Sequence, residues 1–270
     1  MGVLNVTPDS FSDGGNFFSQ EKGVRHALQM ERDGADIIDI GAESTRPGSS
    51  GVSAEEEWTR LAPVLAALRT RLKIPVSIDT RKSEIAAKAL EIGAEMINDV
   101  SGLKHDPRIA EVAARARVPL VVMHMRGEPE TMQQKPFARD ALRDVVRGLR
   151  ESLAMASKAG VKTSQIILDP GIGFGKSYAQ NYELLAKLSE LANLGFPLLA
   201  GTSRKGFISK TLAEDGKPTP SETKIWGTAA TVTASILHGA HIVRVHDVAE
   251  MAHVARVADC ILNPRLAPKN

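Results

Sequence analysis

Short apolar runs alternate with longer segments of helical periodicity along the whole chain. A short, nearly continuous apolar run is typical of a strand buried on both faces of a parallel sheet. The segments between the runs repeat apolar residues every three or four positions and often end at a glycine, as amphipathic helices do. We predict strands at 1–6, 36–41, 74–79, 96–100, 118–124, 166–169, 198–200 and 242–247.

Eight strands that alternate with helices in 270 residues predict one α/β domain, a single (β/α)8 TIM barrel over residues 1–270. The alternative is a doubly wound open sheet. It is less favoured because no Gly-x-Gly-x-x-Gly motif follows the first strand, and no linker divides the chain into halves.

Composition narrows the class of protein further. A net charge of +2, from 34 basic and 32 acidic residues, argues against a nucleic-acid partner. The single cysteine excludes a disulfide framework. Neither a membrane-spanning apolar segment nor a signal leader is visible, so we expect a cytoplasmic protein without a membrane partner.

Polar side chains stand at or directly after the end of each predicted strand, among them Asn5, Asp39 and His124. In a TIM barrel these ends form the active-site face, so their side chains are the candidates for chemistry. The hydrogen-bond acceptors are Asp79, Asn98 and Asp169. The cationic groups are Arg46, Lys205, Arg244 and His246. Acceptors suit a flat heterocycle with a row of N–H donors, and cations suit phosphate or a carboxylate.

Any one of these residues also fits a capping or packing role, but their recurrence at all eight strands favours a binding site. Two further signals are weaker. The glycines of 171–175 could cradle phosphate, although the full Gly-x-x-x-x-Gly-Lys-Ser/Thr spacing of a nucleotide loop is absent. No His and Cys cluster has zinc spacing, and Mg²⁺ held by Asn5 and substrate phosphate stays open. The long polar stretch 125–136 is expected to be a mobile substrate loop.

Eight ordered segments carry a resemblance that covers nearly the whole chain. They are Asn5–Gly15, Gly41–Gly48, Ser77–Thr80, Ile97–Asp99, Met123–Met125, Leu168–Gly171, Ser203–Lys205 and Arg244–His246. In these segments the chain resembles the dihydropteroate synthase family, the folate-biosynthesis enzymes that sulfonamides inhibit. Their fixed order is far more specific than any one of the motifs.

The resemblance implies a transferase that joins 6-hydroxymethyl-7,8-dihydropterin diphosphate to 4-aminobenzoate and releases diphosphate, with Mg²⁺ as cofactor. The implied catalytic residues are Asp79, Asp169 and Lys205. The implied pterin-binding residues are Asp79, Asn98, Met123, Asp169 and Lys205. The implied diphosphate-binding residues are Asn5, Arg244 and His246, with Asn5 also the magnesium ligand. The implied 4-aminobenzoate-binding residues are Phe11, Thr45, Arg46, Pro47, Phe174 and Ser203.

Because an arylamine is a weak nucleophile, we expect the diphosphate to leave early and the amine to trap a pterin-methyl cation. Loops 7–15 and 43–51 are expected to close and exclude water. The family commonly forms homodimers, which we expect here. It also usually carries a short segment before the first strand, whereas the strand predicted here begins at Met1.

Two alternatives stay open. A pterin-binding methyltransferase would share the pterin-holding carboxylates and the asparagine but would not need the Ser203–Lys205 segment. A non-catalytic pterin-binding paralogue would not need the intact loops around 5–15 and 43–48. Within the Ser203–Lys205 segment, we expect Arg204 to point outward into a surface salt bridge.

Overall fold

The structure, a computed structural model, describes residues 1–7, 15–44, 48–49, 51–128, 130–132, 139–214, 217 and 219–268. Of residues 15–19 and 221 it describes the backbone alone.

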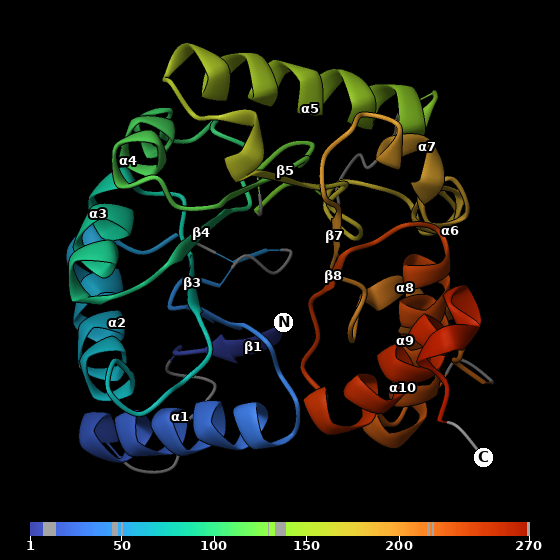
Figure 1. Ribbon diagram of the computed structural model, residues 1–270, viewed down its shortest axis with the longest axis horizontal. Helices are drawn as coiled ribbons and strands as arrows, with labels where there is room; N and C mark the ends of the chain where they lie inside the picture. Colours follow the sequence, from blue (N-terminus) through green and yellow to red (C-terminus); the bar gives the residue numbers. More distant parts are fainter. Residues whose placement is uncertain are drawn as a thin grey trace.

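Eight parallel strands form a closed ring at the centre of the molecule (Figure 1). They are β1 (Gly2–Asn5), β2 (Ile38–Gly41), β3 (Val76–Asp79), β4 (Met96–Asp99), β5 (Leu120–Met123), β6 (Ile166–Asp169), β7 (Leu199–Ala200) and β8 (Ile242–Val243). A six-stranded sheet, β1 to β6, and the pair β7–β8 are joined by parallel bridges between Leu168 and Leu198 and between Gly2 and Val245. The predicted TIM barrel is therefore confirmed.

The last two strands are shorter than the sequence predicts. Regular pairing in β7 and β8 covers two residues each and ends where the polar segments at Gly201 and Arg244 begin. The strand ladder continues only through the Arg244 amide, which donates to the Ala200 carbonyl at 3.0 Å. Apolar runs predicted the positions of these strands correctly, but they do not report where pairing stops.

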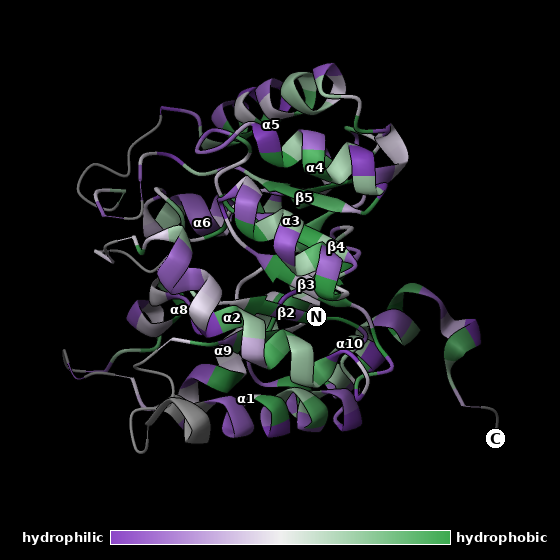
Figure 2. Cartoon of the chain, turned by 90° about the vertical axis from the view of Figure 1, so that its left-hand side faces the viewer, coloured by the Kyte–Doolittle hydropathy of each residue, from purple (hydrophilic) through white to green (hydrophobic). Residues whose placement is uncertain are grey.

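The helices form an outer layer around the ring (Figure 1). They are α1 (Gly15–Arg32), α2 (Ala54–Leu68), α3 (Ser83–Ile92), α4 (Arg108–Ala116), α5 (Ala141–Lys158), α6 (Tyr178–Ala186), α7 (Leu188–Ala192), α8 (Gly206–Thr211), α9 (Ser221–Leu237) and α10 (Val248–Leu262), with short 3₁₀ turns η2 (Thr163–Gln165) and η3 (Pro264–Leu266). In Figure 2 the strand β5 is hydrophobic, whereas the helices beside it carry both hydrophobic and hydrophilic residues, as amphipathic helices do.

Strand alternation directs the site residues into the barrel interior. Successive strand residues point to opposite faces of a sheet, so Ile97 and Leu168 pack outward under the helices. A small interior cluster comprises Met1, Met96, Val121, Ile167 and Leu199. Asn98, Met123 and Asp169 each follow a member of this cluster by two residues. They therefore point to the same interior, one level nearer the carboxyl ends of the strands.

No helix in the described ranges combines the length and the apolar character that a membrane crossing needs.

Candidate active site

The hydrogen-bond acceptors predicted at the strand ends lie at one level of the barrel mouth. The register pairs Asp79 with Asn98 on neighbouring strands, and Met123 with Asp169 on the next pair. Gly41 stands between Asn5 and Asp79 at the same level. A Cβ atom there would lie 3.2 Å from the Cβ of Asp79, so glycine leaves the Asp79 carboxylate unobstructed. The structure thus brings these predicted residues together.

Asp39 fixes the orientation of two of these groups. Its Oδ2 accepts from Asn98 Nδ2 at 3.0 Å and from Arg244 Nε at 2.6 Å, and its side chain is fully buried. Because a carboxylate only accepts, Asn98 must turn its NH₂ toward Asp39 and present its carbonyl oxygen elsewhere. Arg244 also donates to Asp79 Oδ2 at 2.8 Å. One buried carboxylate therefore sets both an acceptor and a cation of the site.

Burial raises the pKa values of the two predicted catalytic carboxyls. The pKa of Asp79 rises to about 7, because desolvation and the charges of Asp39, Glu57 and Asp99 outweigh the attraction of Arg244. The pKa of Asp169 is also raised by burial, against the Gly171 amide and the Lys205 charge. That amide donates to Asp169 Oδ1 at 2.6 Å. Perturbed carboxyls in a confined polar site are typical of functional residues.

Lys205 and Phe174 face each other across the mouth of the barrel. The Lys205 Nζ lies 4.0 Å from the centre of the Phe174 ring, within the range of a cation–π contact. Burial lowers the pKa of Lys205 to about 8, reinforced by Arg244 and opposed by Asp169 and Asp79. The ring also packs against an apolar cluster of Val100, Met123, Met125 and Met132. Apolar and cationic surfaces thus meet beside Asp169.

Ser203 and His246 form a hydrogen-bonded pair. The Ser203 Oγ lies 3.0 Å from His246 Nδ1 and accepts from the His246 amide at 3.2 Å. Burial, with the charges of Arg244, Arg204 and Lys205, lowers the pKa of His246 to about 3. The sequence interpretation counted this histidine among the cations, but in the structure its ring is neutral at pH 7. It can therefore act as a hydrogen-bonding group.

Comparisons with known proteins agree with this geometry. A family model described as a pterin binding enzyme matches residues 1–246. A dihydropteroate synthase of Synechocystis sp. is 49% identical over 261 residues, which are 97% of this chain and 89% of the relative. The chain belongs to the dihydropteroate synthase family.

Solved structures of this family superpose closely on the barrel. Dihydropteroate synthase from Clostridium difficile, crystallised in the presence of pteroic acid, gives a TM-score of 0.89 at 44% identity, with 97% of this chain and 95% of that chain covered. The Xanthomonas albilineans dihydropteroate synthase with 4-aminobenzoic acid gives 0.89 at 41% identity, with 99% and 93% covered. The fold and the family expected from the sequence are both confirmed.

Four site residues implied by the family resemblance cannot be located. Phe11, Thr45, Arg46 and Pro47 lie outside the described residues, as do positions 129 and 133–136 of the polar stretch 125–136 that was expected to be mobile. The root of the loop that holds Thr45 to Pro47 is described. There Glu43 is paired with Arg81 and with Lys82, and Lys82 also contacts the buried Glu57 at 2.5 Å. This ion-pair network ties the root of the loop to the end of β3.

Asn5 is the residue of this site that could hold the Mg²⁺ ion implied for the family. It ends β1 and is half-buried, and its carboxamide makes no hydrogen bond within the described part of the chain. An uncommitted oxygen donor fits a hard cation that takes its other ligands from phosphate and water. Among the described residues no group of three or more His, Cys, Asp or Glu side chains could hold a metal. Asn5 fits a shared, substrate-bound ion.

Two contributors to the site were missed from the sequence. Asp39 was noted as a strand-end residue, but its role in orienting other residues was not. It lies in β2 and bonds to Asn98 in β4 and to Arg244 after β8, and contacts between such distant parts of the chain leave no local signal in the sequence. Lys176 follows the glycines of 171–175, which were considered for phosphate binding, but no role was predicted for the lysine itself. It is 1% exposed, and burial lowers its pKa to about 7.

Arg204 points outward as predicted: its side chain is 53% exposed and paired with Asp247.

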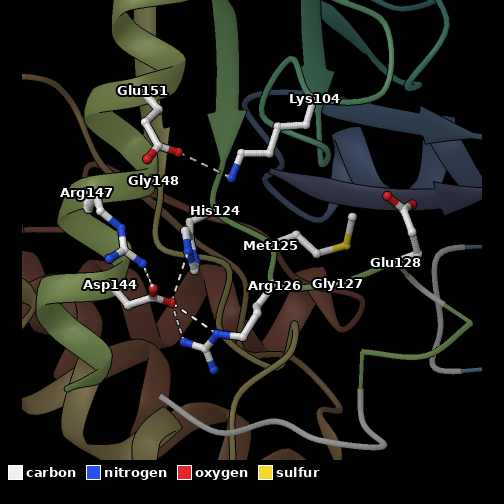
Figure 3. Close-up of a pocket in the computed structure, with 10 residues that line it drawn as sticks. All are labelled: Lys104, His124, Met125, Arg126, Gly127, Glu128, Asp144, Arg147, Gly148 and Glu151. Atoms are coloured by element: carbon white, nitrogen blue, oxygen red, sulfur yellow. Dashed lines mark hydrogen bonds and ion pairs between the residues drawn. The ribbon is translucent and has the colours of Figure 1, made fainter. Parts of the chain in front are cut away.

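A separate pocket of about 340 Å³ lies between the segment after β5 and helix α5 (Figure 3). Its lining includes none of the residues assigned to substrates. Figure 3 shows Asp144 facing His124, Arg126 and Arg147, and the structure pairs it with both arginines. His124 was one of the strand-end residues, yet its ring points toward α5, with Nε2 3.6 Å from Asp144. We therefore exclude His124 from the substrate site.

Proposed function

We propose that the chain condenses 6-hydroxymethyl-7,8-dihydropterin diphosphate with 4-aminobenzoate to give 7,8-dihydropteroate and diphosphate. The observation that carries this proposal is the ring of acceptors at the barrel mouth, Asp79, Asn98 and Asp169, beside the cations Lys205 and Arg244. Family membership over nearly the full chain supports it independently.

The acceptors suit the donor edge of the pterin. Asp79 and Asp169 each offer carboxylate oxygens, and Asn98 offers the carbonyl oxygen that Asp39 leaves uncommitted. Met123, buried beside Phe174, provides an apolar and polarisable surface for a flat ring. Lys205 completes the pterin site as a cation between Asp169 and Phe174.

Arg244, His246 and Asn5 are proposed to bind the diphosphate. Two N–H groups of Arg244 are used by Asp39 and Asp79, which leaves three of its five donors for phosphate oxygens. If Ser203 donates to His246 Nδ1, the neutral ring carries its proton on Nε2 and can donate it to an oxygen. Asn5 would hold a Mg²⁺ ion shared with the diphosphate, and that ion would supply positive charge to the leaving group.

The second substrate, 4-aminobenzoate, is proposed to bind between Phe174 and Ser203, with Phe11, Thr45, Arg46 and Pro47 completing the pocket. Phe174 offers an aromatic face, and Lys205 beside it offers N–H donors for the carboxylate. Sulfonamides, which imitate this substrate, are expected to compete for the same place.

The proposed reaction breaks the C–O bond between the pterin methylene and diphosphate before the amine forms its C–N bond. Departure leaves positive charge on the pterin-methyl group, which the buried carboxylates of Asp79 and Asp169 stabilise. The arylamine lone pair then attacks the methylene carbon, and the nitrogen passes one proton to an oxygen of the released diphosphate. Arg244 and His246 stabilise the negative charge that develops on the leaving oxygen.

We also infer a homodimer, supported by exposed apolar side chains on adjacent helices. Trp226 on α9 is 73% exposed, and Tyr178 and Tyr182 are exposed on α6, a helix that contacts α9. Large exposed aromatic groups are typical of protein interfaces.

Cys260 is a free thiol, which agrees with the proposed cytoplasmic location.

Diphosphate release with and without 4-aminobenzoate tests the proposed function. The synthase predicts release that depends on the amine, together with an equal amount of dihydropteroate. Amine-independent release, or binding of the pterin substrate without release, would favour a non-synthase pterin-binding barrel. Asp169→Ala and Lys205→Ala should nearly abolish the reaction, while Asp36→Ala, a change at an exposed position, should leave it unchanged.

A further inference from the structure

Lys176 is a fully buried cation that touches no carboxylate. Its Nζ donates to the carbonyl oxygens of His124 at 3.1 Å, Gly171 at 2.8 Å and Phe174 at 2.9 Å. A neutral amine has only two N–H groups, so three carbonyl acceptors call for the ammonium form, against the burial that lowers the pKa of this lysine to about 7. All three donors of the ammonium are used. Within the described residues it forms no ion pair, and a backbone cage takes the place of a counter-ion. With three donated bonds the ammonium has no lone pair and is not a nucleophile.

This carbonyl cage joins two segments that support the site. His124 follows β5 and Met123, whereas Gly171 and Phe174 belong to the segment after β6. The Gly171 carbonyl accepts both from Lys176 and from the Phe174 amide at 3.0 Å, which closes a tight turn. The ammonium therefore holds the segment after β6 against the one after β5.

The glycines around the cage show how closely the two segments approach. A Cβ atom on Gly171 would lie 1.9 Å from the His124 carbonyl oxygen, and one on Gly175 would lie 2.2 Å from the Arg126 carbonyl oxygen. Arg126 adds a second tie through its guanidinium, which donates to the Gly175 carbonyl at 2.8 Å. Such close backbone contacts place several carbonyl dipoles together, and the Lys176 ammonium offsets their repulsion.

Both ends of the turn reach the proposed substrate site. The Gly171 amide holds Asp169 Oδ1 at 2.6 Å, and Phe174 carries the ring that faces Lys205. A shift of the turn would therefore move a pterin acceptor and a wall of the 4-aminobenzoate pocket together. Burying an ammonium is costly, and a well-packed apolar residue in the same space would cost less. A positioning function explains why the charge is present.

We infer that Lys176 is a positioning residue: a tethered internal cation that organises the turn 171–174 and so sets Asp169 and Phe174 for catalysis. This inference rests on the proposed function for its activity readout. Its structural part, the dependence of the turn on a caged ammonium, stands apart from the identity of the substrates.

The test uses the full chain with Lys176→Ala, Lys176→Met and Lys187→Ala. Lys176→Met keeps the apolar stem and removes the three donors. Lys187→Ala removes an exposed lysine, paired with Glu183 at the end of α6, and serves as the matched control. Amine-dependent diphosphate release is measured together with hydrogen exchange of a peptide that covers residues 170–177. Thermal unfolding confirms that each variant is folded at the assay temperature.

We expect kcat/KM to fall about tenfold or more in both Lys176 variants, the loss equivalent to one charge-assisted hydrogen bond. Exchange in the turn should become faster in both, and Lys187→Ala should match the wild type. Propylammonium, which replaces the atoms removed in Lys176→Ala, should restore slow exchange and part of the turnover. Tetramethylammonium, which has no N–H donor, should not.

Wild-type turnover and exchange in Lys176→Met would overturn the inference, because the donors would then be dispensable. Equal responses of Lys176→Ala to propylammonium and tetramethylammonium would also overturn it. If the wild-type chain releases no diphosphate, the proposed function fails, and the exchange measurements still decide whether the ammonium organises the turn.

Discussion

Asp39 illustrates how one residue can control the site without contacting the substrate. Its buried carboxylate accepts from both Asn98 and Arg244, so it orients a pterin acceptor and a diphosphate cation together. Removing one partner of a buried charged pair leaves the other uncompensated. Arg244 keeps its bond to Asp79, which limits that cost.

Asp39→Ala is therefore expected to lower the free energy of unfolding by about 2–3 kcal/mol, the size of a hydrogen bond to a charged group. Pterin affinity should fall with it, because Asn98 becomes free to rotate. Urea unfolding and calorimetric titration measure the two effects. Asp36→Ala, a change at an exposed position just before the same strand, is the control and should stay within about 0.5 kcal/mol of the wild type.

The raised pKa of Asp79 predicts pH-dependent pterin binding. Only the ionised carboxylate accepts two N–H donors, and its pKa is raised to about 7, mainly by burial. Affinity should therefore rise about tenfold between pH 6 and pH 8, the change in the ionised fraction. Asp79→Asn should bind the pterin more weakly, and its affinity should no longer rise between pH 6 and pH 8. Titration calorimetry at both pH values measures the affinity. The same rise in affinity in Asp79→Asn as in the wild type would refute the assignment.

The raised pKa of Asp79 makes the folded state less stable at the higher pH values at which the pterin binds best. The folded state binds the Asp79 proton more tightly than the unfolded state, whose carboxyl ionises near 3.8. For this group alone, the free energy of unfolding therefore falls as the pH rises from 3.8 to about 7 and is constant above that. Asp79 costs stability at the pH at which it binds substrate best.

At the scale of secondary-structure elements, the turn after β6 is the most constrained segment of the site. Gly171 combines a φ of 67° with the contact to the His124 carbonyl, whereas Gly195 has a φ of 81° and open space around it. Substitutions at the two positions therefore distinguish the cost of a left-handed backbone from the cost of a steric clash.

Gly195→Ala should lower the free energy of unfolding by about 1 kcal/mol, the strain of a left-handed backbone alone. Gly171→Ala should cost at least about 3 kcal/mol, because the new methyl group also collides with a backbone oxygen. Urea unfolding of both variants measures the difference. Equal losses would show that the turn tolerates displacement and is not held against the segment after β5.

The elements and most of the acceptors could be predicted from the sequence because their causes are local. A short apolar run forms a buried strand, and its period of two directs Asn98 and Asp169 inward at the end of the run. The Lys176 cage could not be predicted, since its three carbonyls come from two segments 47 residues apart at their nearest, at His124 and Gly171. The neutral state of His246 likewise depends on its burial and, besides the neighbouring Arg244, on the charges of Arg204 and Lys205, which lie far from it in the sequence.

At the scale of the whole molecule, β1 and the segment that contains β8 close the ring. The Val245 amide donates to the Met1 carbonyl at 2.9 Å, and the Val3 amide donates to Val245 at 3.0 Å. The terminal ammonium of Met1 donates to the Val243 carbonyl at 3.0 Å. Arg244 is therefore positioned against Asp39 and Asp79 by closure of the barrel.

The exposed aromatic face on α6 and α9 predicts self-association. Light scattering should give a mass near twice 29.0 kDa for the wild type. Trp226→Glu should shift the protein toward the monomer, because a charge in an apolar interface is costly to bury. Lys224→Glu, a charge change on the same helix, is the control. A monomeric wild type would exclude the proposed homodimer without affecting the site assignment.

The most direct test of the central claim is a crystal structure with the pterin substrate bound. The account predicts that the flat ring lies in the barrel mouth, with its N–H edge within about 3.2 Å of Asp79 and Asp169 oxygens and its face against Met123. A pterin bound elsewhere, or one whose donor edge contacts neither carboxylate, would contradict the assignment of this site.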